Sequence, residues 1–324
     1  MHLTIVSMKK IKSGISFLLL TVGFTLFAAD KKHPIADYIE NNRVIDLTVT
    51  VSENYPAHWP THAPFQRWTF NWYMPLPGPY SSNPAPLVGH GMNQPIVPST
   101  FPYFGQRYVI DDHTGTQADF PAHFIPPAGS GLEFASDKGW LTGDKYPLKD
   151  QMGPAVVVDL RKIRDKAKPG ISPKITTAMI KENEKRYGKI QAGDVVIFYT
   201  GYSDAYYKPF PAGDRFAYAP LILKTVPGWP APTIEAVEYL ANKGVRHMAT
   251  DGPSMGPVEG GRDVHVAFLK YGGSWTEFTT KLGQLPPRGA YFISLSAKIV
   301  DMSGGLTRAI AIAPKGLKII DEIK

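Results

Sequence analysis

The sequence predicts a single domain of the α/β class. Two short apolar runs, residues 155–160 and 194–200, have the length and composition of buried strands. Residues 176–187 and 233–242 have the pattern of helices, and each is followed by a glycine within two residues. Strands that alternate with helices in this way favour an α/β architecture. The 324 residues contain no internal repeat or low-complexity segment, and this length suits one large domain.

The first third of the chain predicts few regular elements. Residues 30–42 are expected to form a short amphipathic helix or a linker, and residues 44–51 are rich in β-branched side chains, which favours a strand. Residues 52–104 are dense in Pro, Trp, Tyr and Asn and predict a long, ordered system of surface loops. The aromatic side chains of residues 59–80 could line a pocket for a planar substrate, or pack in the core or at a subunit contact. A strand at residues 107–111 follows.

The later elements have clearer boundaries. Thr176 or Thr177 is a candidate cap for the first helix, and Gly188 lies just past its end. Thr233 is the candidate cap of the second helix, which ends before Gly244. Further strands are expected at residues 245–250, 291–296 and 308–312.

The N-terminus has the pattern of a secretory signal. Lys9, Lys10 and Lys12 form a basic region, and an apolar run over residues 15–29 ends in small side chains. The run is short for a membrane span, although a retained anchor is the alternative. We expect a signal peptide at residues 1–29, a linker or helix at 30–43 and the folded domain at 44–324. The protein is therefore expected to be exported to the periplasm or secreted.

Charge and cysteine content narrow the chemistry. The net charge of +7 falls to +4 without residues 1–29, because three Lys and no acidic residue are lost and 32 basic and 28 acidic residues remain. These charges are dispersed, so nucleic acid is not an expected partner. The chain has no Cys. A metal site would therefore use nitrogen and oxygen ligands, as zinc or manganese sites can.

The segment at residues 112–124, Asp-His-Thr-Gly-Thr-Gln-Ala-Asp-Phe-Pro-Ala-His-Phe, is the most informative part of the chain. His113, Gln117, Asp119 and His123 all occupy odd positions within it. In an extended segment alternate side chains point to one face, so these four could project together. Two imidazoles, a carboxylate and an amide oxygen could hold a divalent metal. A turn with hydrogen-bonded polar residues is the alternative.

Four other polar residues are less informative by themselves. Asp251 and Ser254 follow a predicted buried strand, where functional loops of α/β proteins often lie. His265 and Glu277 are twelve residues apart, and this spacing alone does not distinguish metal ligands from a structural histidine and a solvated carboxylate.

Residues 113–123 resemble the pattern H-x-G-T-[H/Q]-x-D-x-P-x-H of the cyclase family of metal-dependent hydrolases. That family includes kynurenine formamidase, isatin hydrolase and trans-dienelactone hydrolase. The resemblance extends over about residues 44–313 and includes the segments 45–48, 200–201, 251–254, 285–289 and 308–312, together with His265 and Glu277. It implies an α/β fold with a β-barrel-like core flanked by helices, and a homodimer or homotetramer.

The resemblance also implies roles for individual residues. His113, Gln117 and Asp119 would bind the principal metal, and Asp119 would bridge to a second ion where one is present. His265 and Glu277 match the ligands of that second ion in the formamidase branch. His123 would be the catalytic base or acid. Asp251 and Ser254 would orient groups near the metal or contact the substrate.

Gln117 departs from the formamidase branch, which has His at this position. An amide oxygen is a harder and weaker ligand than an imidazole. This favours manganese or a single-ion site, while zinc and two ions remain open.

The expected activity is hydrolysis of a small molecule. A bound divalent metal lowers the pKa of water to about 7 and can polarise a carbonyl. His123 could take the proton of the attacking water and deliver it to the leaving nitrogen or oxygen. The substrate would be an amide, a cyclic imide-like ring or a lactone. The alternative is a non-catalytic metal- or ligand-binding protein on the same scaffold.

Overall fold

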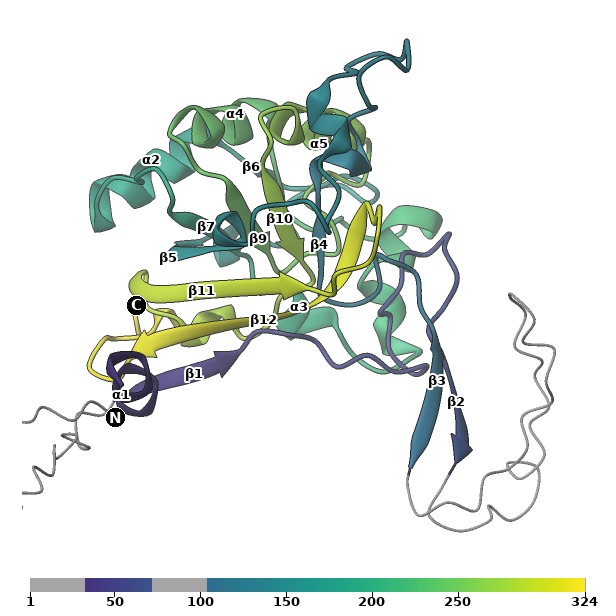
Figure 1. The fold of residues 1–324 in the computed structure, drawn as a ribbon. Coiled ribbons are helices and arrows are strands. Elements are labelled where there is room, and N and C mark those ends of the chain that lie inside the picture. The colour runs from purple at the N-terminus through teal and green to yellow at the C-terminus, as the bar shows by residue number, and fades with distance from the viewer. Residues whose placement is uncertain (1–32, 72–103, 324) are drawn as a thin grey trace, which may run out of the picture.

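Seven strands form a closed barrel at the centre of the molecule (Figure 1). The computed structural model describes residues 33–71 and 104–323. Around the barrel the strands are β12 (Gly304–Pro314), β11 (Arg288–Ser296), β5 (Met152–Asp159), β7 (Val195–Tyr199), β9 (His247–Thr250), β10 (Ser274–Glu277) and β4 (Gln117–Asp119). The barrel closes because the first residues of β12 pair with β4, while its last residues pair with β1 (Asn42–Asp46).

Parallel and antiparallel pairs are mixed in this barrel. β5, β7, β9 and β10 run parallel to their neighbours within that group, and the other ladders are antiparallel. The parallel strands are joined by long connections that contain the helices α2 (Thr177–Tyr187), α3 (Tyr202–Tyr206), α4 (Ile234–Asn242) and α5 (Arg262–Leu269). α2, α4 and α5 lie together over the outer face of these strands (Figure 1). This is the expected fold class: a single α/β domain with a barrel core flanked by helices.

Smaller elements complete the described chain. α1 (Pro34–Asn41) precedes β1, and β2 (Gln66–Asn71) pairs with β3 (Gly105–Val109) as a ribbon that extends away from the barrel (Figure 1). A short pair joins β6 (Lys174–Ile175) to β8 (Ala231–Pro232). Single helical turns lie at Pro121–His123, Asp137–Trp140, Leu148–Gln151, Arg161–Ile163, Ala212–Arg215, Ala219–Leu223, Leu282–Gln284 and Ile320–Glu322.

The continuous apolar runs are explained by burial on both faces of the strands. In β5, Val156 and Val158 pack in the cluster that contains the helices, whereas Ala155 and Val157 pack in the cluster that contains Phe292 of β11. Side chains alternate between faces along a strand, so a strand that is covered on both faces has no polar alternation.

Most predicted elements of the second half are confirmed. The helix at Thr177–Tyr187 ends at Gly188, whose φ of 98° is readily adopted by glycine. Thr233 caps α4, because its Oγ1 accepts a hydrogen bond from the amide of Ala236 at 3.3 Å. The described part of α1 also agrees with a short N-terminal helix.

Three expectations need correction. Residues 52–104 were expected to be loops, but β2 lies within them. Residues 72–103, which include the last part of the predicted aromatic segment 59–80, lie outside the described residues. α5 and β10 were not predicted. The segment 113–123 is not one extended strand, because only Gln117–Asp119 pairs in the barrel and a helical turn begins at Pro121.

The predicted signal at residues 1–29 lies outside the described residues. Within the described ranges, the structure contains no helix with the length and apolar character needed to cross a bilayer.

His247 makes the stability of the barrel depend on pH. It is buried, and its two imidazole nitrogens lie 2.7 Å from Ser274 Oγ and 2.9 Å from Thr276 Oγ1. Burial lowers the pKa of His247 to about 3. Because the folded-state pKa is below the unfolded value of about 6.5, its contribution is complete above pH 6.5 and is lost as the pH falls toward 3.

We therefore expect the free energy of unfolding to fall by about 3 kcal/mol between pH 6.5 and pH 4 because of His247. His247→Gln should be less stable at pH 7 but should have a flatter pH profile in urea unfolding. His33→Gln, at an exposed position, serves as the control. An unchanged slope in His247→Gln would show that another group titrates.

Candidate metal centre

The antiparallel ladder between β4 and β10 sets the centre of the site. Its register places Gln117 opposite Glu277 and Asp119 opposite Trp275. Directly opposed side chains on one face of a sheet lie close enough to interact. Gln117 Nε2 accordingly donates to Glu277 Oε2 at 3.0 Å, and the indole nitrogen of Trp275 donates to Asp119 Oδ2 at 2.9 Å.

His113 enters the site from the turn that precedes β4. Its imidazole is packed against the backbone of β12, where a Cβ on Gly304 would lie 2.5 Å from Nε2 of His113. On the opposite side, Nδ1 of His113 lies 2.6 Å from Asp112 Oδ1. Gly115 has a φ of 63°, which allows the chain to turn from His113 into the strand.

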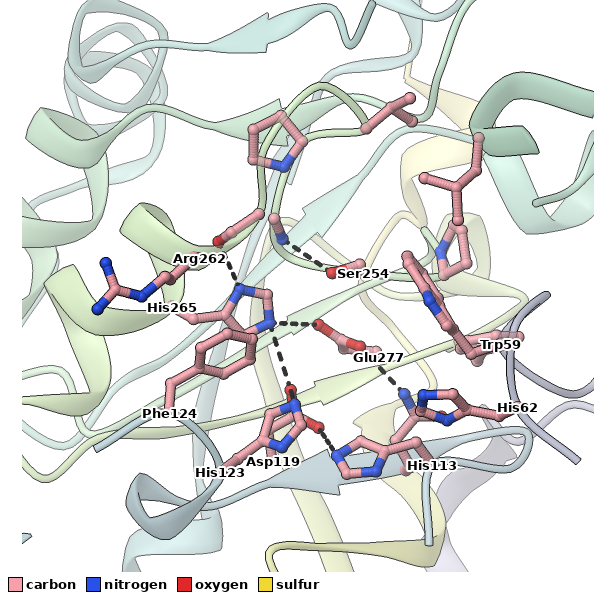
Figure 2. A pocket seen from close by; sticks show the side chains of 18 residues that line it. Trp59, His62, His113, Asp119, His123, Phe124, Ser254, Arg262, His265 and Glu277 are labelled. Atoms are coloured by element: carbon pink, nitrogen blue, oxygen red, sulfur yellow. Dashed lines mark hydrogen bonds and ion pairs between the residues drawn. The ribbon is translucent and has the colours of Figure 1, made fainter. Parts of the chain in front are cut away.

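The other two histidines come from helical segments. His123 ends the turn Pro121–His123, and its imidazole lies against that of His113 with 4.1 Å between centroids. His265 is on α5, where its Nδ1 lies 2.7 Å from the carbonyl oxygen of Gly261. This contact directs Nε2 of His265 toward Asp119 Oδ2 at 3.5 Å and Glu277 Oε1 at 3.9 Å (Figure 2).

Three residues that line this site each have a buried atom without a hydrogen-bond partner in the described part of the chain: His113 Nε2, Gln117 Oε1 and Asp119 Oδ1. His113 Nε2 and Asp119 Oδ1 are 3.3 Å apart, but they are not aligned as a hydrogen bond. Buried polar atoms are nearly always paired, because leaving one unpaired costs about 1–3 kcal/mol. One imidazole nitrogen, one amide oxygen and one carboxylate oxygen are suitable ligands for a divalent metal.

The surrounding charges favour a cation in the same place. Burial by itself would lower the pKa of His113, but the carboxylates of Asp112 and Asp119 outweigh it and raise that pKa to about 11. Burial opposes ionisation of Asp119, yet His123 and His113 hold its pKa well below the usual range. Burial and the charge of Asp119 raise the pKa of Glu277. The carboxylates thus stabilise positive charge at this site.

His123 has a different environment. Burial lowers its pKa to about 4, although the charge of Asp119 acts in the opposite direction. Its side chain is 24% exposed, compared with 9% for His113. His123 therefore lies nearer to solvent than His113 does.

These side chains line one cavity of about 300 Å³ (Figure 2). The apolar part of its lining includes Trp59, Phe124, Leu221, Val258 and Phe278. Ser254 also lines it, and its Oγ accepts a hydrogen bond from the amide of Gly256 at 3.0 Å. A cavity that combines a few polar side chains with apolar ones is typical of small-molecule sites.

The structure brings together seven of the eight predicted site residues. They are His113, Gln117, Asp119, His123, Ser254, His265 and Glu277. Asp251, which was expected to orient groups near the metal or contact the substrate, is not among the residues that line the cavity. Its carboxylate is fully buried and accepts hydrogen bonds from Thr200 and from the amide of Tyr202, so it ties the ends of β7 and β9 together.

The sequence analysis missed two contributions. His62, which no sequence pattern singled out, lines the cavity, with Nδ1 at 3.2 Å from Asp111 Oδ1. Asp112 contacts His113, and only its adjacency to the motif could have indicated this.

Comparison with known families agrees with this geometry. Residues 45–257 match the Cyclase family model, which is more than half of the chain. The chain belongs to the Cyclase family.

Two relatives are similar in sequence. Isatin hydrolase from Roseibium aggregatum is 28% identical over 246 residues, which cover 74% of this chain and 86% of the relative. Kynurenine formamidase from Erythrobacter litoralis is 29% identical over 206 residues, which cover 63% and 74%.

Solved structures share the fold. An isatin hydrolase bound to the product analogue thioisatinate has a TM-score of 0.64 at 22% identity, with 85% of this chain and 94% of that chain covered. Isatin hydrolase A from Ralstonia solanacearum has a TM-score of 0.63 at 24% identity, with 85% and 93% covered.

Gly304→Ala should weaken metal binding, because the new Cβ would displace the imidazole of His113. We expect the affinity for zinc or manganese to fall about 10–100-fold, as for other changes that disturb a ligand's support. Competition with a chromophoric chelator measures this. Gly316→Ala is the matched control, since nothing lies within 4 Å of its Cβ. Equal affinity in the two variants would argue against His113 as a ligand.

Proposed function

We propose that this protein is a metal-dependent hydrolase that opens the C–N bond of an amide or a cyclic imide-like ring, or the C–O bond of a lactone. The carrying observation is that His113, Gln117 and Asp119 line one cavity and that Nε2, Oε1 and Oδ1 of these residues are buried without hydrogen-bond partners in the described chain. Membership of the Cyclase family supports the proposal, as do the relatives named isatin hydrolase and kynurenine formamidase.

The same three atoms would hold the metal, for which zinc and manganese are the candidates. The ion would polarise the substrate carbonyl and lower the pKa of a water molecule beside it. Gln117 can serve as a ligand because its amide is oriented: Nε2 donates to Glu277, which leaves Oε1 buried and without a partner in the described chain. In this orientation one of the two hydrogens on Nε2 meets Glu277 Oε2.

We propose that the active protein binds one metal ion at this site. Both oxygens of Glu277 are already engaged, Oε1 by the amide of Met255 at 2.5 Å and Oε2 by Gln117. His265 and Asp119 lie beside it, and an ion bound between the three would share the oxygens of Glu277 with these two hydrogen bonds. In this arrangement Glu277 orients Gln117, and His265 supports Asp119.

His123 is the proposed proton carrier. It lies 3.9 Å from Asp119 Oδ2, at the more exposed side of the cavity. Within the described residues its nitrogens make no hydrogen bond, whereas Nδ1 of His113 and of His265 each has a partner. The imidazole of His123 is therefore free to take a proton from the attacking water and to return it to the leaving nitrogen or oxygen.

Location and assembly are also part of the proposal. The basic and apolar segments before residue 30 support export to the periplasm or the medium. Homodimers or homotetramers are proposed from the family resemblance alone.

The direct test combines metal analysis of the purified protein with a hydrolysis screen. The screen contains N-formyl amides, isatin-like rings and lactones, each with added zinc or manganese. Turnover that is lost with a chelator and restored by the ion is expected. A protein that binds the ion but hydrolyses none of these compounds would support the alternative of a non-catalytic binding protein.

His123→Ala should retain the metal and lose turnover. The expected decrease in kcat is about 10²–10⁴-fold, the usual contribution of a general acid or base. Metal content and steady-state kinetics on the best substrate of the screen measure the two effects. If kcat remains unchanged, His123 does not transfer the proton.

Gln117→His should increase the affinity for zinc relative to manganese, because an imidazole nitrogen is a softer ligand than an amide oxygen. We expect the zinc affinity to rise at least about tenfold, which corresponds to a binding free energy more favourable by about 1.4 kcal/mol. Gln284→His, at an exposed position, is the control. No difference between the variants would mean that residue 117 is not a ligand.

A further inference from the structure

We propose that Asp112 is a positioning residue that holds the imidazole of His113 for metal binding, with Ser303 as its support. This inference rests on the proposed function, since it assumes that His113 is a ligand. The family pattern H-x-G-T-[H/Q]-x-D begins at the first histidine, so it does not include the position of Asp112.

The contacts of Asp112 are specific on both of its oxygens. Oδ1 lies 2.6 Å from Nδ1 of His113, and Oδ2 accepts a hydrogen bond from Ser303 Oγ at 2.9 Å. Ser303 is itself fixed, because its carbonyl oxygen accepts a hydrogen bond from the amide of Phe120 at 3.0 Å. Asp112 is therefore connected to the junction of β4 and β12, where the other ligands lie.

This contact determines which nitrogen of His113 faces the other ligands. A carboxylate only accepts hydrogen bonds, so Nδ1 carries a proton and donates it to Asp112. In a neutral imidazole, the lone pair is then on Nε2, the atom that lies 3.3 Å from Asp119 Oδ1. Carboxylates that support ligating histidines in this way also increase the basicity of the ligand nitrogen.

The neighbouring carboxylate has a different function. Asp111 Oδ1 accepts a hydrogen bond from the backbone amide of His113 at 2.9 Å and contacts His62. Asp111 thus holds the turn, whereas Asp112 holds the imidazole. Because Nδ1 of His113 is already engaged, the group formed by Asp111, Asp112 and His113 is better explained as support than as a separate metal site.

The test measures zinc and manganese affinity and stoichiometry in the full chain. The variants are Asp112→Ala, Asp112→Asn and Ser303→Ala. Asp301→Ala is the matched control, because Asp301 lies near Ser303 and pairs with Lys145 instead of a site residue. Thermal melting of the metal-free proteins reports whether each variant is folded.

Asp112→Ala should weaken the affinity for zinc about 10–100-fold without a change in stoichiometry. Asp112→Asn should lie between this variant and the wild type, because an amide oxygen can still accept from Nδ1 but lacks the charge. Ser303→Ala should lose less than about tenfold, since it removes only the support of Asp112. The control should bind as the wild type does.

Two results overturn the inference alone: an Asp112→Ala affinity within about twofold of the wild type, or the loss of a whole equivalent of ion, which would make Asp112 a ligand. A wild-type protein that binds neither ion would instead overturn the proposed function, and this inference with it. The affinity of the wild type therefore distinguishes the two failures.

Discussion

The register between β4 and β10 is the constraint on which the site depends. A shift of one residue would turn Gln117 and Asp119 away from the cavity, because successive side chains of a strand point to opposite faces. The observed register pairs Gln117 with Glu277 and Asp119 with Trp275. β4 has only three residues, yet it pairs with β10 on one edge and β12 on the other, so its register is fixed from both sides.

The register that places these residues at the site also lowers the stability of the metal-free fold locally. His113, Gln117 and Asp119 each present a buried atom without a hydrogen-bond partner, at about 1–3 kcal/mol for each. The rest of the barrel can tolerate this, because β5, β7 and β9 are covered by apolar side chains on both faces. A bound cation would satisfy these atoms. We therefore expect the metal to stabilise the fold as well as to serve the chemistry.

Gln117 shows how one substitution can change a shared site. In the resemblance to the formamidase branch, the amide stands where an imidazole is expected, and it needs a partner to direct its oxygen inward. Glu277 provides that partner at 3.0 Å. In the proposed arrangement Glu277, which matches a ligand position by sequence, therefore supports the ligand Gln117 instead of binding the metal itself. Asp112 provides the corresponding support for His113.

The sequence by itself determined the α/β class and most strands and helices of the second half. It also identified four candidate site residues between His113 and His123. Both results were possible because periodicity and short spacings are local properties. The sequence did not determine how these four converge: only Gln117 and Asp119 share a strand, and a helical turn places His123. The family resemblance indicated Glu277 and His265, but only the tertiary structure placed them at the site, Glu277 from 160 residues beyond Gln117 and His265 on an unpredicted helix. The tertiary structure also placed Asp251 outside the cavity lining, where its carboxylate accepts hydrogen bonds from Thr200 and Tyr202. Strand register and helix packing decide which residues far apart in the sequence come together, and a local sequence pattern specifies neither of them.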